Sequence, residues 1–167
     1  MQFKVNEYIF YGTDGICLID DVCEEPFEGA PCGVSYYVMH TLSEPRQTIW
    51  CPTSNTRVPM RTLLKDSEID GLLESVCAFS PFSAPSAKLL REEYIGAIKG
   101  GLPTEWGRVL VTYLSRCAVN DGTVRVTEAE RGFFENARAL LSAEIAVVRG
   151  IEKREAEMLV DAAVKYF

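Results

Sequence analysis

Hydrophobic and polar positions follow the period of β-strands over about the first sixty residues. Four segments rich in β-branched and aromatic residues alternate with turn-forming residues, at 8–11, 15–22, 34–41 and 48–51. The segment 24–33 contains two prolines and two glycines, so it predicts a long hairpin loop. We expect five short strands in this half, which together suggest a small barrel.

From residue 66 onward the hydrophobic period becomes that of α-helices. The predicted helices lie near 66–78, 86–99, 103–118, 127–149 and 152–166. Between them, prolines, paired glycines and an Asn-Asp-Gly turn signal at 120–122 interrupt the pattern. The pattern therefore indicates an α+β protein, with a β domain over residues 1–62 and an all-α domain of about five helices over 63–167.

The strongest local signals lie in the last two predicted helices. Thr127 and Glu130 have the spacing of a capping box, and Gly150 supplies a left-handed residue that ends a helix. Between these signals, apolar residues recur every three or four positions. They are Phe133, Phe134, Ala137, Leu140, Leu141, Ile145 and Val148. None of these residues has a side chain that commonly performs catalysis. The stripe therefore predicts a helix face that packs against the rest of the domain.

Composition narrows the classes of function. The 167 residues carry a net charge of −7, which disfavours nonspecific binding to nucleic acid because such binding depends on excess Lys and Arg. No apolar run approaches the roughly 20 residues that cross a bilayer, and the N-terminus lacks the zones of a signal peptide. We expect a cytoplasmic protein with no membrane contact.

Candidate catalytic and metal-binding chemistry is sparse. The six cysteines form no CxxC pair and there is a single histidine, so we expect no metal and no cofactor. His40 and Cys51 could form a base and a nucleophile, but no third group is marked to orient them. We expect a protein that is not an enzyme, and keep a hydrolase using this pair as an alternative.

Both tryptophans allow two interpretations. Trp106 lies on a helical stripe with Val109, Leu110 and Tyr113, which favours the core over a DNA contact. Trp50 is equally compatible with an exposed binding surface and with the cover of a small barrel. The cations between positions 88 and 108 could face phosphates, but interleaved glutamates make a solvated helix face at least as good an account.

Several segments taken together resemble the CarD/CdnL family of bacterial transcription regulators, whose N-terminal module is shared with transcription-repair coupling factor. The likeness is carried by Phe3-Lys4-Val5, Tyr11, Gly15, Tyr36-Tyr37-Val38, Thr48-Ile49-Trp50-Cys51-Pro52, Ala137-Arg138, Leu140-Leu141, Glu144, Gly150-Ile151 and Glu155-Ala156-Glu157. It extends over nearly the whole chain. No single motif is decisive, and the joint order is what makes the likeness specific.

The resemblance implies a five-stranded SH3/Tudor-like barrel that binds the RNA polymerase β subunit, followed by a helical domain that approaches promoter DNA. Strand addition is the implied mode of polymerase binding. By position, the docking edge would consist of Thr48, Ile49, Trp50, Cys51 and Pro52. The implied function is regulation of open-complex formation or stability, as a monomer or a domain-swapped dimer.

The chain departs from the family pattern at two positions. Trp50 stands where members carry methionine or arginine, and Ser86 stands where many carry a tryptophan that wedges into melted DNA. The basic residues after that slot are Lys88 and Arg91. Ser86, Lys88 and Arg91, all in the helical domain, are the expected DNA contacts. A second hypothesis is an adaptor that binds polymerase or another protein and has lost direct DNA contact.

Overall fold

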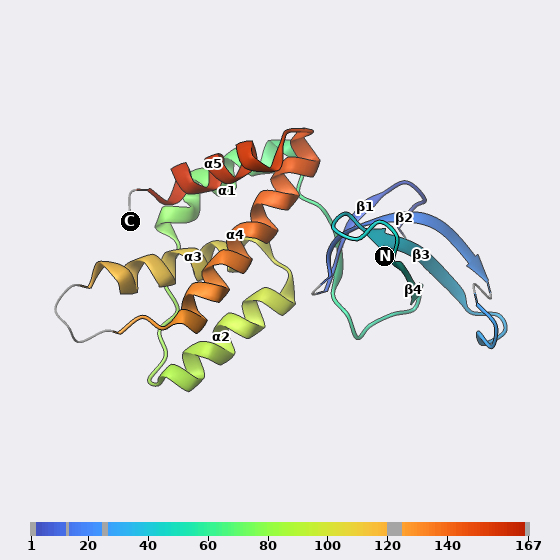
Figure 1. Ribbon diagram of the computed structural model, residues 1–167, viewed down its shortest axis with the longest axis horizontal. Helices are drawn as coiled ribbons and strands as arrows, with labels where there is room; N and C mark the ends of the chain where they lie inside the picture. The colour runs from blue at the N-terminus through green and yellow to red at the C-terminus, as the bar shows by residue number, and fades with distance from the viewer. Residues whose placement is uncertain (1–2, 13, 25–26, 120–124, 166–167) are drawn as a thin grey trace. The chain divides into compact units, whose positions relative to one another are not determined.

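The computed structural model describes residues 3–12, 14–24, 27–119 and 125–165. The chain divides into two compact units, Met1–Leu63 and Leu64–Phe167. The described residues form five β-strands in the first unit and five α-helices in the second, which makes the protein α+β (Figure 1). Among these residues, no helix is long and apolar enough to cross a membrane.

The first unit is a five-stranded antiparallel sheet in the order β4-β3-β2-β1-β5. Its strands are β1 (Tyr8–Tyr11), β2 (Gly15–Glu24), β3 (Ser35–Thr41), β4 (Thr48–Pro52) and β5 (Met60–Thr62). The first four agree with the predicted segments to within two residues. Within the described residues, β4 and β5 lie at opposite edges of the sheet and do not pair with each other.

Strand alternation builds the core of the sheet unit. Successive side chains of a strand point to opposite faces, and on one face the apolar residues form a continuous cluster. The buried cluster on that face consists of Phe3, Ile9, Cys17, Ile19, Tyr37, Met39 and Cys51. The Tyr37 hydroxyl, which this core buries, accepts a hydrogen bond from the Phe3 N–H at 3.1 Å. The chain entering β1 is thereby fixed to β3.

The second unit contains the helices α1 (Asp66–Ser75), α2 (Ala87–Gly100), α3 (Pro103–Ala118), α4 (Glu128–Arg149) and α5 (Lys153–Val164), with a short 3-10 helix, η1 (Val76–Ala78), after α1. All five α-helices begin and end within three residues of the predicted positions. The turn signal predicted at 120–122 lies outside the described residues.

Local signals and packing account for the helices together. The capping box of Thr127 and Glu130 starts α4, and Gly150, with a φ of +63°, ends it. Trp106 of α3 is fully buried, which confirms its assignment to the core. On the predicted α4 stripe, Ala137, Leu141 and Ile145 are buried, whereas Phe133, Phe134, Leu140 and Val148 are half-buried.

Candidate functional site

The segment 48–52, in which sequence reasoning placed a docking edge, forms β4 at one edge of the sheet. Among the described residues β4 pairs only with β3, with Trp50 opposite Val38 and Cys51 opposite Tyr37. An edge strand presents backbone N–H and C=O groups that can pair with a further strand. The position of β4 therefore permits strand addition.

The register identifies which backbone groups point away from β3. The Thr53 N–H donates to the Ser35 carbonyl at 2.8 Å. Residues of an antiparallel strand alternate between those that bond to the neighbour and those that face away from it. Counting back from Thr53, the groups of Cys51 and Ile49 bond to β3, while those of Thr48 and Trp50 point outward. We call these outward groups of Thr48 and Trp50 the open rim.

Pro52 ends the open rim. Proline has no N–H, and this residue falls at an outward position, where β3 requires no donor from it. Its carbonyl accepts a hydrogen bond from the Asn55 N–H at 2.9 Å, which closes a turn. The open rim is therefore restricted to two residues, and any added strand would be short.

An aromatic patch lies beside the open rim. The side chain of Trp50 is 45% exposed. Its ring centroid is 5.6 Å from that of Phe27, which in turn lies 5.7 Å from Tyr36 in an edge-to-face arrangement. We call Trp50, Phe27 and Tyr36 the aromatic patch. Trp50 is therefore exposed surface rather than the cover of the core, which settles the two interpretations that its sequence position allowed.

Sequence reasoning missed Phe27 because it lies in the segment assigned to a hairpin loop. The only signal was a large aromatic residue between prolines and glycines, where solvated polar residues are usual. Phe27 is itself 41% exposed and shields Tyr36, which is only 6% exposed. It contributes apolar surface that the strand alone could not provide.

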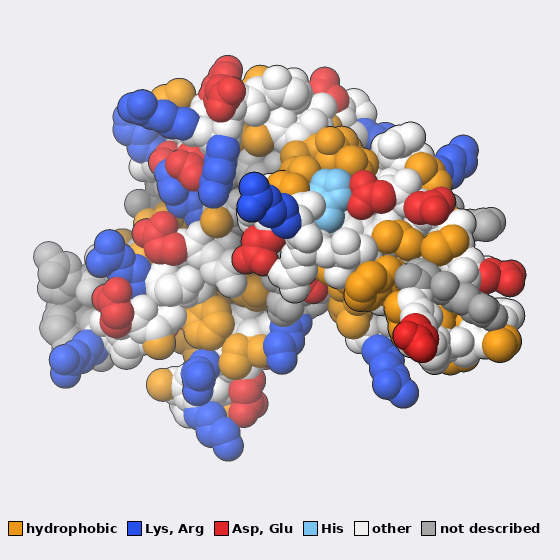
Figure 2. Space-filling model, turned by 45° about the vertical axis from the view of Figure 1, so that its right-hand side comes forward, with side chains coloured by type: hydrophobic (Ala, Val, Ile, Leu, Met, Phe, Trp, Pro, Cys, Tyr) orange, Lys and Arg blue, Asp and Glu red, His pale blue; other side chains and the backbone are white. Residues whose placement is uncertain are grey.

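His40 and Asp20 add a polar pair to the same face of the sheet. A bulge in β2 between Ile19 and Asp21 displaces Asp20 from the regular register. Its carboxylate lies 2.7 Å from His40 Nδ1. Figure 2 shows the imidazole, the single pale-blue side chain, beside an acidic side chain and among hydrophobic ones. Because His40 is two residues from Val38, it lies on the face that carries Trp50.

Cys51 faces the opposite side of the sheet from His40. Its side chain is 2% exposed and belongs to the buried cluster, and burial raises the pKa of its thiol, opposed by a hydrogen bond with Tyr11. A raised pKa keeps the thiol protonated and a poor nucleophile. The two side chains therefore do not form the base and nucleophile pair that the sequence allowed.

The expected DNA-contact positions lie at the start of α2. Ser86 is the N-cap, and its hydroxyl accepts a hydrogen bond from the Leu89 N–H at 3.3 Å. Its side chain thus stabilises the helix start and cannot act as an apolar wedge. Lys88 and Arg91 are exposed on the first turns of α2. The structure brings these three residues together on one helix, in the unit that does not contain the open rim.

The described residues contain no group of three or more His, Cys, Asp or Glu side chains that could hold a metal ion. Comparison with models of known protein families and with curated proteins finds no match for this chain.

Proposed function

We propose that this protein is a bacterial transcription regulator that binds the β-subunit lobe of RNA polymerase through the open rim and modulates formation or stability of the promoter open complex. The single observation that carries the proposal is that β4 is an edge strand whose outward backbone groups adjoin the exposed Trp50. The resemblance of the sequence to the CarD/CdnL family names the partner. The proposal includes a Tudor-like barrel, a cytoplasmic location and no catalytic activity.

Two kinds of contact would act at this edge. A strand of the polymerase would pair with the outward N–H and C=O groups of Thr48 and Trp50, which supplies affinity without regard to sequence. The rings of Trp50 and Phe27 would be buried beside it, and aromatic residues of this kind dominate the binding energy of many interfaces. Because the rim is short, most specificity would come from the aromatic patch.

A second candidate is an adaptor that binds polymerase and does not touch DNA. Two observations favour it: the net charge of −7, and the engagement of Ser86 as a helix cap where a wedge residue would be needed. Lys88 and Arg91 are then the only remaining residues of the expected contact. This candidate retains the open rim and dispenses with the DNA role of α2.

Capture of the polymerase β lobe tests the first step, which both candidates share. Trp50→Ala should weaken capture at least tenfold, because it removes the most exposed ring of the aromatic patch. Tyr8→Ala is a matched control, since Tyr8 is a 40% exposed aromatic residue on the same sheet and outside the aromatic patch. Equal capture by wild type and Trp50→Ala would remove this residue from the interface.

The two candidates differ in their effect on DNA. The regulator should change the binding of polymerase to a forked promoter, and this effect should weaken as salt rises because phosphate contacts release counterions. Lys88→Gln combined with Arg91→Gln should then reduce the effect and its salt dependence. If the protein leaves promoter binding unchanged at every ionic strength while still capturing the β lobe, the adaptor is the correct function.

A further inference from the structure

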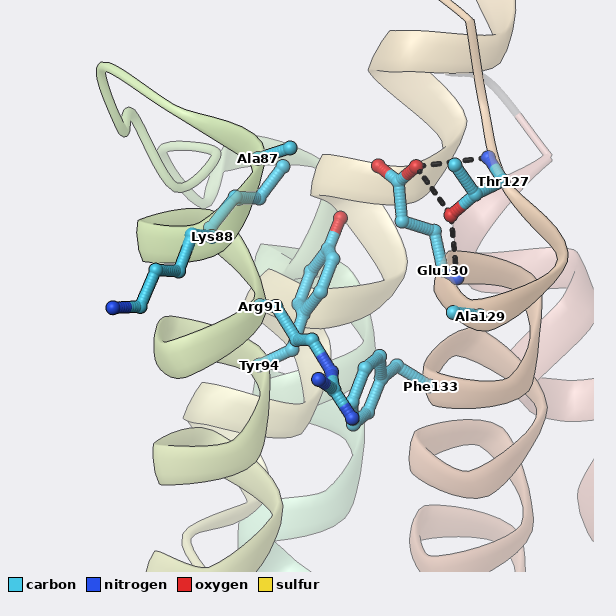
Figure 3. Close-up of a pocket in the computed structure, with 9 residues that line it drawn as sticks. Ala87, Lys88, Arg91, Tyr94, Thr127, Ala129, Glu130 and Phe133 are labelled. Atoms are coloured by element: carbon cyan, nitrogen blue, oxygen red, sulfur yellow. Dashed lines mark hydrogen bonds between the residues drawn. The ribbon is translucent and has the colours of Figure 1, made fainter.

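A cavity of about 320 Å³ lies between the N-terminal turns of α2 and α4 (Figure 3). Its volume falls at the small end of the range for ligand pockets. Its wall is mostly apolar and is formed by Ala87, Leu90, Tyr94, Ala129 and Phe133. Polar groups are few, so their positions decide what the cavity can bind.

The hydroxyl of Tyr94 lacks a hydrogen-bond partner among the described residues, although the side chain is fully buried. A buried hydroxyl without a partner costs free energy, and native proteins leave few of them. Figure 3 shows this hydroxyl at the end of the cavity that lies between Ala87 and Glu130. Burial first and the Glu130 carboxylate second raise the pKa of Tyr94 to about 12, so the hydroxyl remains protonated and can donate.

Arg91 provides a positive charge at another part of the cavity. Its side chain extends from α2 toward Phe133 of α4, whereas the amine of Lys88 points away from the cavity (Figure 3). Within the described part of the chain Arg91 makes no ion pair. The first turns of both helices contribute further positive potential through their backbone dipoles. This part of the cavity therefore suits an anion.

The negative charge of Glu130 does not cancel this preference. Its carboxylate lies 2.6 Å from Nε of Arg116 and accepts a hydrogen bond from the Thr127 N–H at 2.9 Å. The carboxylate is thus already balanced by a cation and a helix cap. It still has acceptor capacity, since an ionised carboxylate can accept about four hydrogen bonds. The Glu130 carboxylate is therefore a hydrogen-bond acceptor, and it lies beside the Tyr94 hydroxyl, which is a hydrogen-bond donor.

We infer that this pocket binds a small aromatic carboxylate bearing a hydroxyl group at the end opposite the carboxylate. The ligand carboxylate pairs with Arg91, and its ring packs against Phe133. The ligand hydroxyl accepts a hydrogen bond from Tyr94 and donates one to Glu130. This pairing satisfies the buried hydroxyl that the protein alone leaves without a partner. The inference does not rest on binding to polymerase, because each of these groups belongs to the helical unit.

Three probes test the assignment by isothermal titration calorimetry with the full chain: 4-hydroxyphenylacetate, phenylacetate and 4-hydroxyphenylacetamide. For molecules of this size we expect a Kd of about 1 mM or tighter for the first probe. Each of the other two lacks one polar contact and should bind about tenfold more weakly. Failure of 4-hydroxyphenylacetate to bind, or equal binding of all three probes, would overturn the inference.

Two variants assign each contact to its residue. Tyr94→Phe should abolish the preference for the hydroxylated acid over phenylacetate, and should leave thermal stability unchanged or raised because the lost hydroxyl had no partner. Arg91→Gln should abolish the preference for the acid over the amide. Arg154→Gln, an exposed arginine on α5, is the charge-matched control and should retain both preferences. If Tyr94→Phe still prefers the hydroxylated acid, Tyr94 does not bind the ligand hydroxyl. If Arg91→Gln still prefers the acid over the amide, Arg91 does not bind the carboxylate.

Ala129→Leu tests whether the probes occupy this cavity at all. Ala129 lines the cavity and is otherwise exposed, and leucine is a good helix former, so the variant should fold normally while filling the space. We expect it to lose binding of 4-hydroxyphenylacetate. Binding equal to wild type would show that the probe binds elsewhere and would overturn the inference, even if polymerase capture remained intact.

Discussion

The backbone N–H of Leu64 donates a hydrogen bond of 2.7 Å to the carboxylate of Glu144, across a sequence separation of 80 residues. Glu144 lies on α4 and its side chain is fully buried. Burying a carboxylate is costly unless hydrogen bonds compensate for the lost water. The contact therefore attaches the first residue of the helical unit to its longest helix.

Glu144→Ala should lower the free energy of unfolding of the helical unit by about 2–3 kcal/mol, because it leaves the Leu64 N–H without this acceptor and opens a cavity. Glu144→Gln keeps an oxygen at the same place and should lose less. Glu135→Ala removes an exposed glutamate from the same helix and should change stability by less than about 0.5 kcal/mol. Urea unfolding followed by circular dichroism compares the three; equal losses at positions 135 and 144 would contradict the role of burial.

Two helical glycines should respond to alanine with opposite signs. A Cβ atom at Gly107 would lie 2.6 Å from a ring carbon of Phe79 and 2.9 Å from Val76 Cγ2, so Gly107→Ala should destabilise the protein by about 1–3 kcal/mol. At Gly96, apart from its chain neighbours and the backbone of its own helix, no atom lies within 4 Å of such a Cβ, so Gly96→Ala should stabilise α2 by about 0.5–1 kcal/mol. Thermal unfolding of both variants measures the difference. A gain at Gly107 would show that Phe79 moves away at little cost.

Local signals explain why the helix boundaries could be predicted from the sequence. Within a helix, proline is tolerated in the first turn, which is where Pro103 begins α3. Gly150 adopts the left-handed conformation that ends α4. The capping box of Thr127 and Glu130 acts within a single turn. Each of these signals depends on neighbours in the sequence, so no knowledge of the tertiary fold is needed.

Contacts between distant segments could not be predicted in the same way. The sequence indicated a fifth strand without locating it, because the three residues of β5 (Met60–Thr62) become a strand only by pairing with β1. The contact of Phe27 with Trp50 requires a loop to fold back over β4. The cavity beside Tyr94 likewise depends on how α2 and α4 pack. The segment 48–52, predicted as a docking edge, forms an edge strand. Its aromatic neighbour Phe27 and the two-residue length of the open rim follow only from the structure.

The buried thiol of Cys17 should make stability fall in alkali. Burial first and the Asp14 carboxylate second raise the pKa of this thiol from its ordinary 9.0 to about 12. Above pH 9 the unfolded chain releases a proton that the folded chain keeps, so this contribution is complete below pH 9 and is lost as pH rises toward 12. Tyr11, whose pKa burial also raises to about 12, acts in the same direction.

Cys17→Ala should therefore flatten the decline of the urea midpoint between pH 9 and 12, in addition to any constant loss from the smaller side chain. The constant loss lowers the urea midpoint equally at every pH, whereas titration of the thiol changes the slope of the midpoint against pH. The two effects can therefore be measured separately. Cys32→Ala, at an exposed cysteine, should leave the slope as in wild type. An unchanged slope in Cys17→Ala would contradict the raised pKa.

Proline substitution distinguishes strand addition from contact through side chains alone. The Thr48 N–H points outward in β4, so Thr48→Pro removes a donor from the open rim without removing a hydrogen bond to β3, and edge strands tolerate proline at such positions. We expect at least tenfold weaker capture of the polymerase β lobe with an unchanged unfolding transition. Thr48→Val, which keeps the N–H and changes the side chain, should capture the lobe as wild type does. In contrast, Ile49→Pro removes a bond to β3 and should destabilise the sheet. Full capture by a folded Thr48→Pro variant would mean that the outward N–H of Thr48 pairs with no partner strand, leaving the aromatic patch to carry the interaction.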